Sequence, residues 1–385
     1  MTPPPHQPKP TYKIACIGGD GIGPEVISAG VEVLRAICAS PRCGFDLEFH
    51  EYDWSSDRYL RTGRYIPDDD DDLEGRKDQG LNSLKEKDAI LFGSVGTPSV
   101  PDHISLWGLR LSICQPLQMY ANVRPSKILP GISSPLSGVT VGDLDWLIIR
   151  ENSEGEYSGH GGRSHLGQDH EVATEVSIFT RSSLLRIMRF AFSQASLRPR
   201  KLLTVVTKSN AQRNGMVLWD QVASEVSTEF PDVRWDRMLV DAMTVRMVRD
   251  PASLDTIVAT NLHADILSDL AAALSGSIGI APTANLDPTR RNPSMFEPIH
   301  GSATDIVGKG LANPVGTFWS SAMMLDWLGE TRASQLLLQA IRHCCQEVNV
   351  KTPDVGGSST TGQVTQAMIR YITSNDRLLQ LDSEA

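Results

Sequence analysis

The sequence predicts an α/β fold with two lobes, and three observations support this prediction. Short apolar runs typical of buried strands alternate along the chain with longer segments of helical periodicity. Several apolar runs end directly in glycine-rich or polar turns, as strands of an open α/β sheet do where ligands bind. The chain has 385 residues, more than one hydrophobic core usually spans, so two domains or two lobes sharing one sheet are expected.

The composition is that of a soluble globular protein and excludes several function classes. A net charge of −10 disfavours nucleic acid or an anionic membrane as the main partner, although a local basic pocket could still bind an anionic substrate. No apolar run approaches the length of a membrane span. Residues 1–11 are proline-rich without a signal core, so we expect a disordered tail. The six cysteines lack metal-binding spacing and are interpreted as reduced thiols of a cytoplasmic protein.

The chain begins with an apolar strand, 12–17, followed by the turn Gly18-Gly-Asp-Gly-Ile-Gly-Pro-Glu25 and a helix over 26–37. The glycines of the turn do not fit the G-x-G-x-x-G pattern of a dinucleotide-binding loop. We therefore exclude a Rossmann phosphate loop and expect the backbone of this turn to lie near a ligand pocket.

Two further strands and a polar stretch follow. Residues 45–53 and 89–92 have the composition of strands, and the second runs into the glycine/proline loop 93–98. Between them, residues 63–88 show no apolar period and include five consecutive aspartates, 68–72. We interpret this stretch as a solvated loop rather than a metal site.

The middle third of the chain places charged or polar side chains at the ends of four predicted strands. Such strand ends line ligand crevices in open α/β sheets. An arginine there can hold a carboxylate through two hydrogen bonds, whereas the alternative is a surface salt bridge. The strands and the side chains that follow them are 146–149 with Arg150 and Tyr157, 202–206 with Lys208, 234–240 with Asp241, and 255–259 with Asp265 and Asp269.

Asp265 and Asp269 are the strongest candidates for metal ligands. Their spacing of four residues in a helical segment puts both carboxylates on one helix face. Paired oxygen ligands with open positions suit Mg²⁺ or Mn²⁺. A solvated acidic helix face is the alternative for such a pair in isolation. The charged residues at the neighbouring strand ends favour the metal site.

The remaining predicted elements are helices and one hairpin, and the final third adds two polar segments with candidate binding residues. These segments are Glu297-Pro-Ile-His-Gly-Ser-Ala-Thr-Asp305 and Gly308-Lys-Gly-Leu-Ala-Asn-Pro314. No repeat of fixed period occurs. Helices are predicted over 182–196, 215–229, 316–328, 332–348 and 362–373, and a projecting hairpin within 158–179.

Between about 12 and 373 the chain resembles the NAD(P)-dependent β-decarboxylating dehydrogenases, the family of isocitrate, isopropylmalate, tartrate and D-malate dehydrogenases. The sub-pattern Val100-Pro-Asp-His-Ile-Ser-Leu-Trp-Gly108 is most similar to the tartrate/D-malate branch. The resemblance rests on the turn 18–25, Arg150-Glu-Asn-Ser-Glu-Gly-Glu-Tyr157, Thr207-Lys-Ser-Asn210, Val240-Asp-Ala-Met243, the segment 261–269, and His300-Gly-Ser-Ala-Thr-Asp305 with Asn313-Pro314.

The resemblance implies an isopropylmalate dehydrogenase-like fold, with two lobes that share a large mixed sheet flanked by helices. The large, cofactor-binding lobe would comprise 12–119 and 276–385, and the small lobe 120–275. The active site would lie between the lobes and be completed by a second subunit, so a homodimer with shared sites is expected. The implied ligands are a small dicarboxylate substrate, NAD, and Mn²⁺ or Mg²⁺, with neither nucleic acid nor membrane as partner.

By match of motif, the resemblance also implies a role for each candidate residue. Asp305 suits a free ribose 2′-hydroxyl and would repel a 2′-phosphate, which favours NAD over NADP. Tyr157 would be the general acid, and Lys208 of the second subunit the base or the residue that positions its water. The implied metal ligands are Asp265, Asp269 and the second subunit's Asp241; the substrate-binding residues are Arg124 and Arg150; the cofactor-binding residues are His300, Gly301, Ser302, Ala303, Asp305 and Asn313.

One position departs from the family pattern. Ten residues before Arg124 the family has a further arginine, and here that residue is Cys114. A thiol cannot hold a carboxylate as an arginine does, and Arg110, one turn earlier, is the candidate substitute. The expected reaction is therefore oxidation and decarboxylation of D-malate or tartrate. The alternatives are isopropylmalate or another 3-substituted malate, and a non-catalytic regulatory family member.

Overall fold

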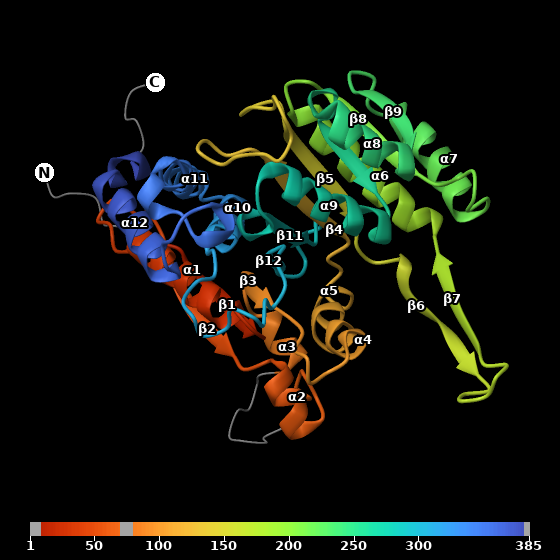
Figure 1. The fold of residues 1–385 in the computed structure, drawn as a ribbon, viewed down its shortest axis with the longest axis horizontal. Helices are drawn as coiled ribbons and strands as arrows, with labels where there is room; N and C mark the ends of the chain where they lie inside the picture. Colours follow the sequence, from red (N-terminus) through yellow and green to blue (C-terminus); the bar gives the residue numbers. More distant parts are fainter. Residues whose placement is uncertain (1–8, 70–79, 381–385) are drawn as a thin grey trace, which may run out of the picture. The chain divides into compact units, whose positions relative to one another are not determined.

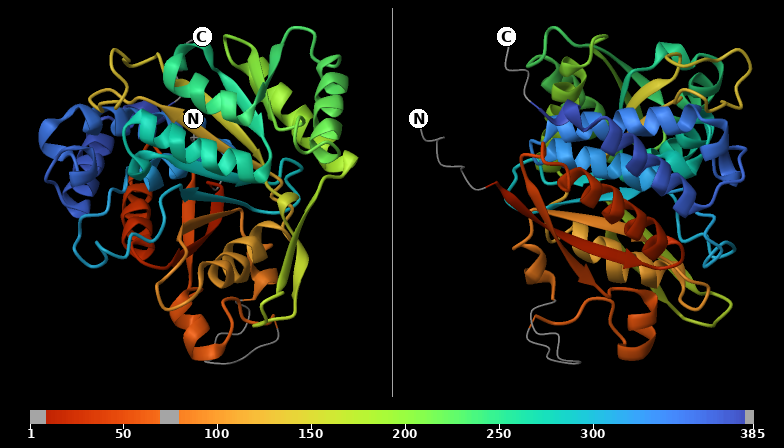
Figure 2. Two further views of the ribbon diagram at one scale, coloured as in Figure 1. Left: turned by 45° about the vertical axis from the view of Figure 1, so that its right-hand side comes forward. Right: turned by 90° about the vertical axis from the view of Figure 1, so that its left-hand side faces the viewer.

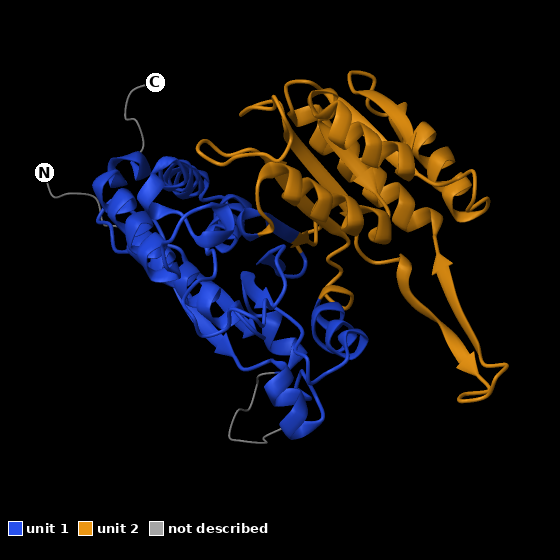
Figure 3. Cartoon of the chain, viewed as in Figure 1, with its two compact units in different colours: residues 1–113, 279–284, 291–385 blue, residues 114–278, 285–290 orange. Residues whose placement is uncertain are grey.

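The computed structural model describes residues 9–69 and 80–380. The predicted N-terminal tail and the five-aspartate run lie mostly outside this part of the chain. The chain divides into two compact units, coloured separately in Figure 3: unit 1 comprises 1–113, 279–284 and 291–385, and unit 2 comprises 114–278 and 285–290. None of the described helices is long and apolar enough to cross a membrane.

Ten strands form one mixed sheet, in the order β2-β1-β3-β12-β11-β4-β5-β10-β8-β9, and β6 and β7 form a separate hairpin (Figure 1). In unit 1, β1 pairs in parallel with β2 and β3, and β3 pairs in parallel with β12. In unit 2, β4 and β5 are antiparallel, whereas β5, β10, β8 and β9 are parallel. The strands are β1 Thr11–Gly19, β2 Asp46–Tyr52, β3 Ala89–Ser94, β4 Ala121–Lys127, β5 Asp145–Glu151, β6 Gly155–Ser164, β7 Val172–Ile178, β8 Leu202–Thr207, β9 Arg234–Leu239, β10 Thr256–Ala259, β11 Pro282–Leu286 and β12 Ser294–Pro298.

Helices pack against these strands in both units. In unit 1, α1 contacts α10 and α12, and α11 contacts both of these helices (Figures 1 and 2). In unit 2, a buried core that includes Trp146, Ile257 and Leu267 joins β5 and β10 to α9. The helices are α1 Gly23–Cys38, α2 Ser56–Thr62, α3 Leu81–Leu84, α4 Asp102–Ser105, α5 Ser112–Cys114, α6 Arg181–Leu197, α7 Gly215–Ser227, α8 Val240–Arg249, α9 Asn261–Ser275, α10 Val315–Trp327, α11 Thr331–Gln346 and α12 Thr361–Ser374, with a π-helical turn at Leu106–Leu111.

The long elements agree with the sequence prediction to within a few residues. The predicted hairpin is β6–β7, which extends away from the rest of unit 2 in Figures 1 and 2. The polar stretch 63–88 was expected to lack regular structure, but it contains the short helix α3. The sequence also did not predict strands β4, β11 and β12 or the π-helical turn, because these elements are short and have no clear period.

Candidate functional site

The helix that carries the predicted metal ligands is α9, which begins directly after β10. Its apolar residues, among them Leu267 and Ala271, are buried against the core of unit 2. Asp265 is half-buried and Asp269 is exposed. Because the two carboxylates are one helical turn apart, both lie on the same side of the helix. The local geometry that the sequence predicted for this pair is therefore present.

Two buried arginines converge on Asp265. Arg124 lies on β4 and Arg150 at the end of β5, and their exposed fractions are 5% and 1%. An amino nitrogen of Arg124 lies 3.3 Å from Oδ1 of Asp265, and Arg150 donates a hydrogen bond to the same oxygen. A buried guanidinium is costly unless it is paired, so this carboxylate stabilises both arginines.

Neutral side chains hold the arginines in place. Nε of Arg124 donates to Oδ1 of Asn122 at 2.8 Å, and its Nη1 donates to the hydroxyl of Ser268 at 2.5 Å. Nε of Arg150 donates to Oδ1 of Asn261 at 2.8 Å. The motifs of the sequence predicted no role for Asn122, Ser268 or Asn261. Asn122 could have been found, because it lies two positions before Arg124 on a strand and therefore faces the same side.

Tyr157 belongs to the same cluster. Its hydroxyl donates to Oδ2 of Asp265 at 3.3 Å, and the guanidinium carbon of Arg150 lies 5.2 Å from the centre of its ring. Gln115, for which the sequence predicted no role, donates from its side-chain amide nitrogen to the backbone carbonyl oxygen of Tyr157 at 3.3 Å. The structure thus brings Arg124, Arg150 and Tyr157 together around Asp265.

Lys208 and Asp241 form a separate pair. Lys208 follows β8, Asp241 lies in the first turn of α8, and the lysine ammonium donates to Oδ1 of Asp241 at 2.5 Å. This hydrogen bond lowers the pKa of the exposed Asp241. Within residues 9–69 and 80–380, no three His, Cys, Asp or Glu side chains of one chain lie together as a metal site. The assignment of Lys208 and Asp241 to a second subunit's site remains a prediction.

The carboxylates of Asp265 and Asp269 on α9 have the chemistry of ligands for a divalent cation. The pKa of Asp269 is raised, first because neighbouring groups partly shield its carboxylate from water and then because Asp265 repels its charge, while the two arginines oppose this shift. A cation beside two crowded carboxylates relieves such repulsion, and oxygen donors are the ligands that Mg²⁺ and Mn²⁺ prefer.

The residues predicted to bind the cofactor lie in unit 1, in the loop after β12. His300 is buried, and burial lowers its pKa and favours the neutral ring. Its Nδ1 lies 3.0 Å from the carbonyl oxygen of Gly301, whereas its Nε2 is buried without a hydrogen-bond partner among the described residues. A buried polar atom of this kind is costly unless a ligand satisfies it, so the residue fits a nucleotide site.

The rest of this loop is also defined by hydrogen bonds and backbone conformation. The carbonyl oxygen of Ser302 accepts a hydrogen bond from the amide of Ile22 at 2.9 Å, and Ala303 has a φ of 41°, in the left-handed region. The side-chain amide of Asn313 donates to Asp354 at 3.0 Å, and its Oδ1 accepts from the amide of Val315, the first residue of α10, at 3.0 Å. Asp305 is exposed, and its carboxylate could therefore reach a ligand.

The structure gives Arg110 a partner of its own. It lies in the π-helical turn, a rare element that often occurs at functional sites. Its Nε lies 2.8 Å and its Nη2 2.7 Å from Oε1 of Glu297 on β12, and both side chains are buried. The charge of Arg110 is thus balanced by Glu297 in this structure, and its role as a substitute for the missing arginine stays a prediction. Cys114 is also buried, with 1% of its surface exposed.

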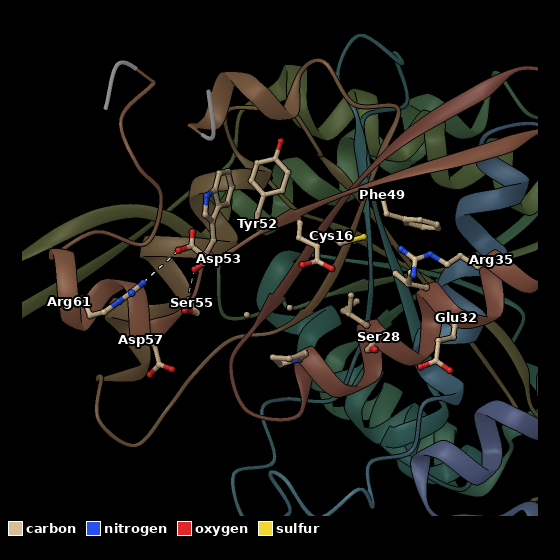
Figure 4. Close-up of a pocket in the computed structure, with 17 residues that line it drawn as sticks. Cys16, Ser28, Glu32, Arg35, Phe49, Tyr52, Asp53, Ser55, Asp57 and Arg61 are labelled. Atoms are coloured by element: carbon tan, nitrogen blue, oxygen red, sulfur yellow. Dashed lines mark hydrogen bonds and ion pairs between the residues drawn. The ribbon is translucent and has the colours of Figure 1, made fainter. Parts of the chain in front are cut away.

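Unit 1 contains an open cavity of about 530 Å³ between α1, β2 and α2, shown in Figure 4. It contains none of the residues predicted to bind metal, substrate or cofactor. Arg35 stacks over Phe49, and Arg61 lies 3.6 Å from a carboxylate oxygen of Asp53. Four acidic residues and two arginines line the cavity, so its charge disfavours a dicarboxylate ligand: Glu32, Glu51, Asp53 and Asp57, with Arg35 and Arg61.

The model of the family described as isocitrate/isopropylmalate dehydrogenase matches residues 13–372. The chain belongs to this family. The resemblance stated from the motifs is thereby confirmed, as is the α/β fold with one large mixed sheet. The crystal structure of isocitrate dehydrogenase from Methylococcus capsulatus has a TM-score of 0.83 and 31% sequence identity to this chain, and the similarity covers 94% of this chain and 99% of that one.

The chain is also similar to two named relatives along nearly its whole length. The probable tartrate dehydrogenase/decarboxylase TtuC' of Agrobacterium vitis is 62% identical over 366 residues, which cover 95% of this chain and 99% of the relative. The D-malate dehydrogenase [decarboxylating] of Escherichia coli (strain K12) is 46% identical over 369 residues, with coverage of 94% and 99%. The names of both relatives describe oxidation and decarboxylation of hydroxy diacids.

Proposed function

We propose that the protein is an NAD-dependent and divalent-metal-dependent dehydrogenase that oxidises and decarboxylates a malate-type 2-hydroxy diacid, D-malate or tartrate. The observation that carries this proposal is the cluster of Arg124, Arg150 and Tyr157 around Asp265. The names of the tartrate and D-malate relatives support the same substrate class.

The charge of the cluster suits a dianion bound with a cation. The formal charges of the two buried arginines and the two carboxylates of α9 sum to zero. A bound divalent cation would therefore leave an excess of two positive charges. A dicarboxylate substrate balances that excess, and burial of the two arginines strengthens the attraction. Arg124 and Arg150 would bind substrate carboxylate oxygens through their charged N–H groups.

A cation held by Asp265, Asp269 and Asp241 of the partner subunit would lower the pKa of the substrate hydroxyl and stabilise the negative charge that forms when CO₂ leaves. Bound NAD would supply the acceptor for the hydride from C2 of the substrate. Lys208 of the partner subunit takes the hydroxyl proton, and Tyr157 gives a proton to C3 after decarboxylation. Conversion of D-malate and NAD⁺ to pyruvate, CO₂ and NADH releases no net proton. The proton lost from the substrate hydroxyl is therefore balanced by the proton added at C3.

NAD is proposed as the cofactor, bound in unit 1. The unpartnered Nε2 of the buried His300 supports a ligand beside it. The exposed carboxylate of Asp305 suits a ribose 2′-hydroxyl and repels a 2′-phosphate, which favours NAD over NADP.

A homodimer is part of the proposal. Helices α8 and α9 contact each other and carry Asp241 and the aspartate pair, yet each exposes large apolar side chains to water. An exposed apolar patch beside a site is typical of a surface that a second subunit covers. These side chains and their exposed fractions are Val245 56%, Val248 44%, Leu262 37% and Ile266 55%. The six cysteines are free thiols, which is consistent with the cytoplasmic location that we propose.

A substrate panel tests the proposed function. The protein would be assayed with D-malate, L- and meso-tartrate, isopropylmalate and isocitrate, with NAD and Mn²⁺, while NADH and CO₂ are measured. We expect NADH and CO₂ in equal amounts from D-malate or a tartrate, and no activity after chelation of the metal. A protein that is inactive on the whole panel would contradict the proposal and favour a non-catalytic family member.

A second candidate substrate is a malate with an apolar group at C3. The observation that favours it is the buried turn at Cys114, where a thiol and the buried neighbours Ile113 and Leu117 replace a charged clamp with apolar surface. A higher kcat/KM for isopropylmalate than for D-malate and the tartrates in the same panel would support this alternative.

A further inference from the structure

Three loops of unit 1 are tied together by their backbones. The first is the turn 18–23, the second the loop 93–98, which includes the last two residues of β3, and the third the segment 300–305. The amide of Asp20 donates to the carbonyl oxygen of Ser94 at 2.8 Å, and the amide of Ile22 to that of Ser302 at 2.9 Å. The turn 18–23 therefore bridges the other two loops.

The bridge leaves no space for side chains at two glycines. A Cβ at Gly19 would lie 2.0 Å from the carbonyl oxygen of Ser94, and one at Gly21 would lie 2.0 Å from that of Ser302. Both glycines also have a positive φ, of 70° and 62°. This explains why the turn has glycines although it does not match a dinucleotide fingerprint.

The side chain of Asp20 adds the strongest connection. It is 6% exposed and accepts three hydrogen bonds. Oδ1 accepts from the amide of Ser56 at 2.6 Å, while Oδ2 accepts from the Ser56 hydroxyl at 2.6 Å and from the amide of Gly96 at 2.8 Å. The Ser56 hydroxyl also lies 2.9 Å from the hydroxyl of Tyr65. A carboxylate that accepts several short hydrogen bonds fixes its donors firmly.

A cavity of about 470 Å³ lies between two of the loops that the turn 18–23 bridges, one bonded to Asp20 and the other to Ile22. The loop 95–98 and residues 100–102 line it on one side, and Gly301, Ser302 and Thr304 on the other. Among the described residues that line the cavity, Asp102 is the one with a charged side chain, so these residues offer no cation for a diphosphate. Their charge and hydroxyls instead suit ribose hydroxyl groups and the positively charged ring of oxidised nicotinamide.

We propose that Asp20 is a positioning residue for the dinucleotide, whose carboxylate holds the loop 93–98 at the distance from 300–305 that the nicotinamide ribose of NAD requires. This inference rests on the proposed function, because it takes NAD as the cofactor. Asp20 acts through the amide of Gly96 and not by direct contact with the ligand. Without the hydrogen bond from Gly96 to Asp20, the loop 93–98 is no longer held in one conformation. Only a fraction of the protein then has the loop conformation that binds NAD, so the affinity for NAD falls.

Asp20→Asn tests the proposal. The amide keeps the size of the side chain but replaces one acceptor oxygen with a donor group, which would face the N–H or O–H donors. We expect the KM for NAD to rise about ten- to a hundredfold, with kcat within about threefold of wild type and the KM for the diacid unchanged. Calorimetric titration with NAD should show the same loss of affinity. A merely structural role would lower the amount of active enzyme without this separation of KM from kcat.

Asp376→Asn is the matched control. Asp376 accepts hydrogen bonds from the Ser40 hydroxyl at 2.8 Å and from Arg42 at 2.7 Å, also in unit 1 but in none of the three loops. We expect its KM for NAD to equal that of wild type. An unchanged KM and affinity for NAD in Asp20→Asn, with an active wild type, would overturn this inference alone. A wild type that neither binds nor reduces NAD would overturn the proposed function and this inference together.

Hydrogen exchange of the wild-type protein gives a second test in case Asp20→Asn does not fold. The amide of Gly96 is bonded to Asp20, and saturating NAD should slow exchange in 93–98 and 300–305 at least about tenfold, because the ligand lies against both loops. Unchanged exchange in both loops under saturating NAD would overturn the inference.

Discussion

Asp265 is the residue on which the candidate site depends at the scale of single side chains. It forms ion pairs with both buried arginines and accepts a hydrogen bond from Tyr157, so it orients three proposed functional groups in addition to its proposed role as a metal ligand. Charge pairing of this kind is common at functional sites, where like charges and desolvation are tolerated because a ligand completes the balance.

Asp265→Asn should abolish metal-dependent activity, with kcat/KM lower by at least about a thousandfold, because a metal ligand and the partner of two arginines are lost together. Since the Asp265 side chain is 39% exposed, water can solvate the arginines in part, and we expect a stability loss of only about 1–2 kcal/mol. Activity assays across a Mn²⁺ titration and urea unfolding would measure the two effects. Unchanged metal affinity in a folded variant would refute the metal assignment.

Arg150→Lys tests whether the guanidinium geometry matters. A lysine keeps the charge but cannot donate at once to Asn261, to Asp265 and to a substrate carboxylate. We expect kcat/KM for the diacid to fall about tenfold or more, mostly through KM, while the KM for NAD is unchanged. Equal kinetics of the variant and the wild type would exclude Arg150 from substrate binding.

Cys114→Arg tests the position where the chain departs from its family. If the substrate is D-malate or tartrate, an added arginine should raise kcat/KM for that diacid several-fold, although overpacking of a buried site will lower the stability by about 1–3 kcal/mol. Cys114→Ser is the control without added charge. No gain in kcat/KM would favour a substrate with an apolar group at C3.

At the scale of helices and strands, the pairing of β4 with β5 and the position of α9 determine which of these side chains lie close together. Strands β4 and β5 are antiparallel, with Asn122 opposite Arg150 and Arg124 opposite Ile148. The two arginines therefore come from neighbouring strands, and α9 carries their shared partner. The exposed apolar side chains of α8 and α9 indicate that these helices are also where a second copy would bind.

Val245→Glu combined with Ile266→Glu should separate the proposed dimer. Both residues are exposed in the single chain, so the charges cost little in a monomer but are strongly unfavourable in a buried interface. Light scattering after size-exclusion chromatography should show a shift from dimer to monomer, with loss of activity and an unchanged circular dichroism spectrum. Leu60→Glu, at an exposed apolar residue of unit 1, is the matched control that should stay dimeric. A variant that remains an active dimer would contradict the assignment of this interface.

At the scale of the whole molecule, ligands should stabilise the fold in proportion to their affinity. A ligand at a hundred times its Kd adds about 2.7 kcal/mol to the free energy of unfolding, which raises Tm by a few degrees for a chain of this size. We expect Mn²⁺ together with D-malate or tartrate to produce such a shift, measured by differential scanning fluorimetry. Asp265→Asn should show no shift with Mn²⁺, and a wild-type response that persists in this variant would indicate a metal site elsewhere.

The sequence by itself determined the α/β class, the long helices and strands, and the aspartate pair on α9, because these depend on local periodicity and on the chemistry of neighbouring residues. Its motifs also determined the family. Only the tertiary structure decided which residues far apart in the sequence contact each other. Arg110 pairs with Glu297, 187 residues away, and Asp20 accepts a hydrogen bond from the amide of Gly96, 76 residues away. Such contacts follow from sheet order and loop geometry, which the periodicity of a single segment does not specify.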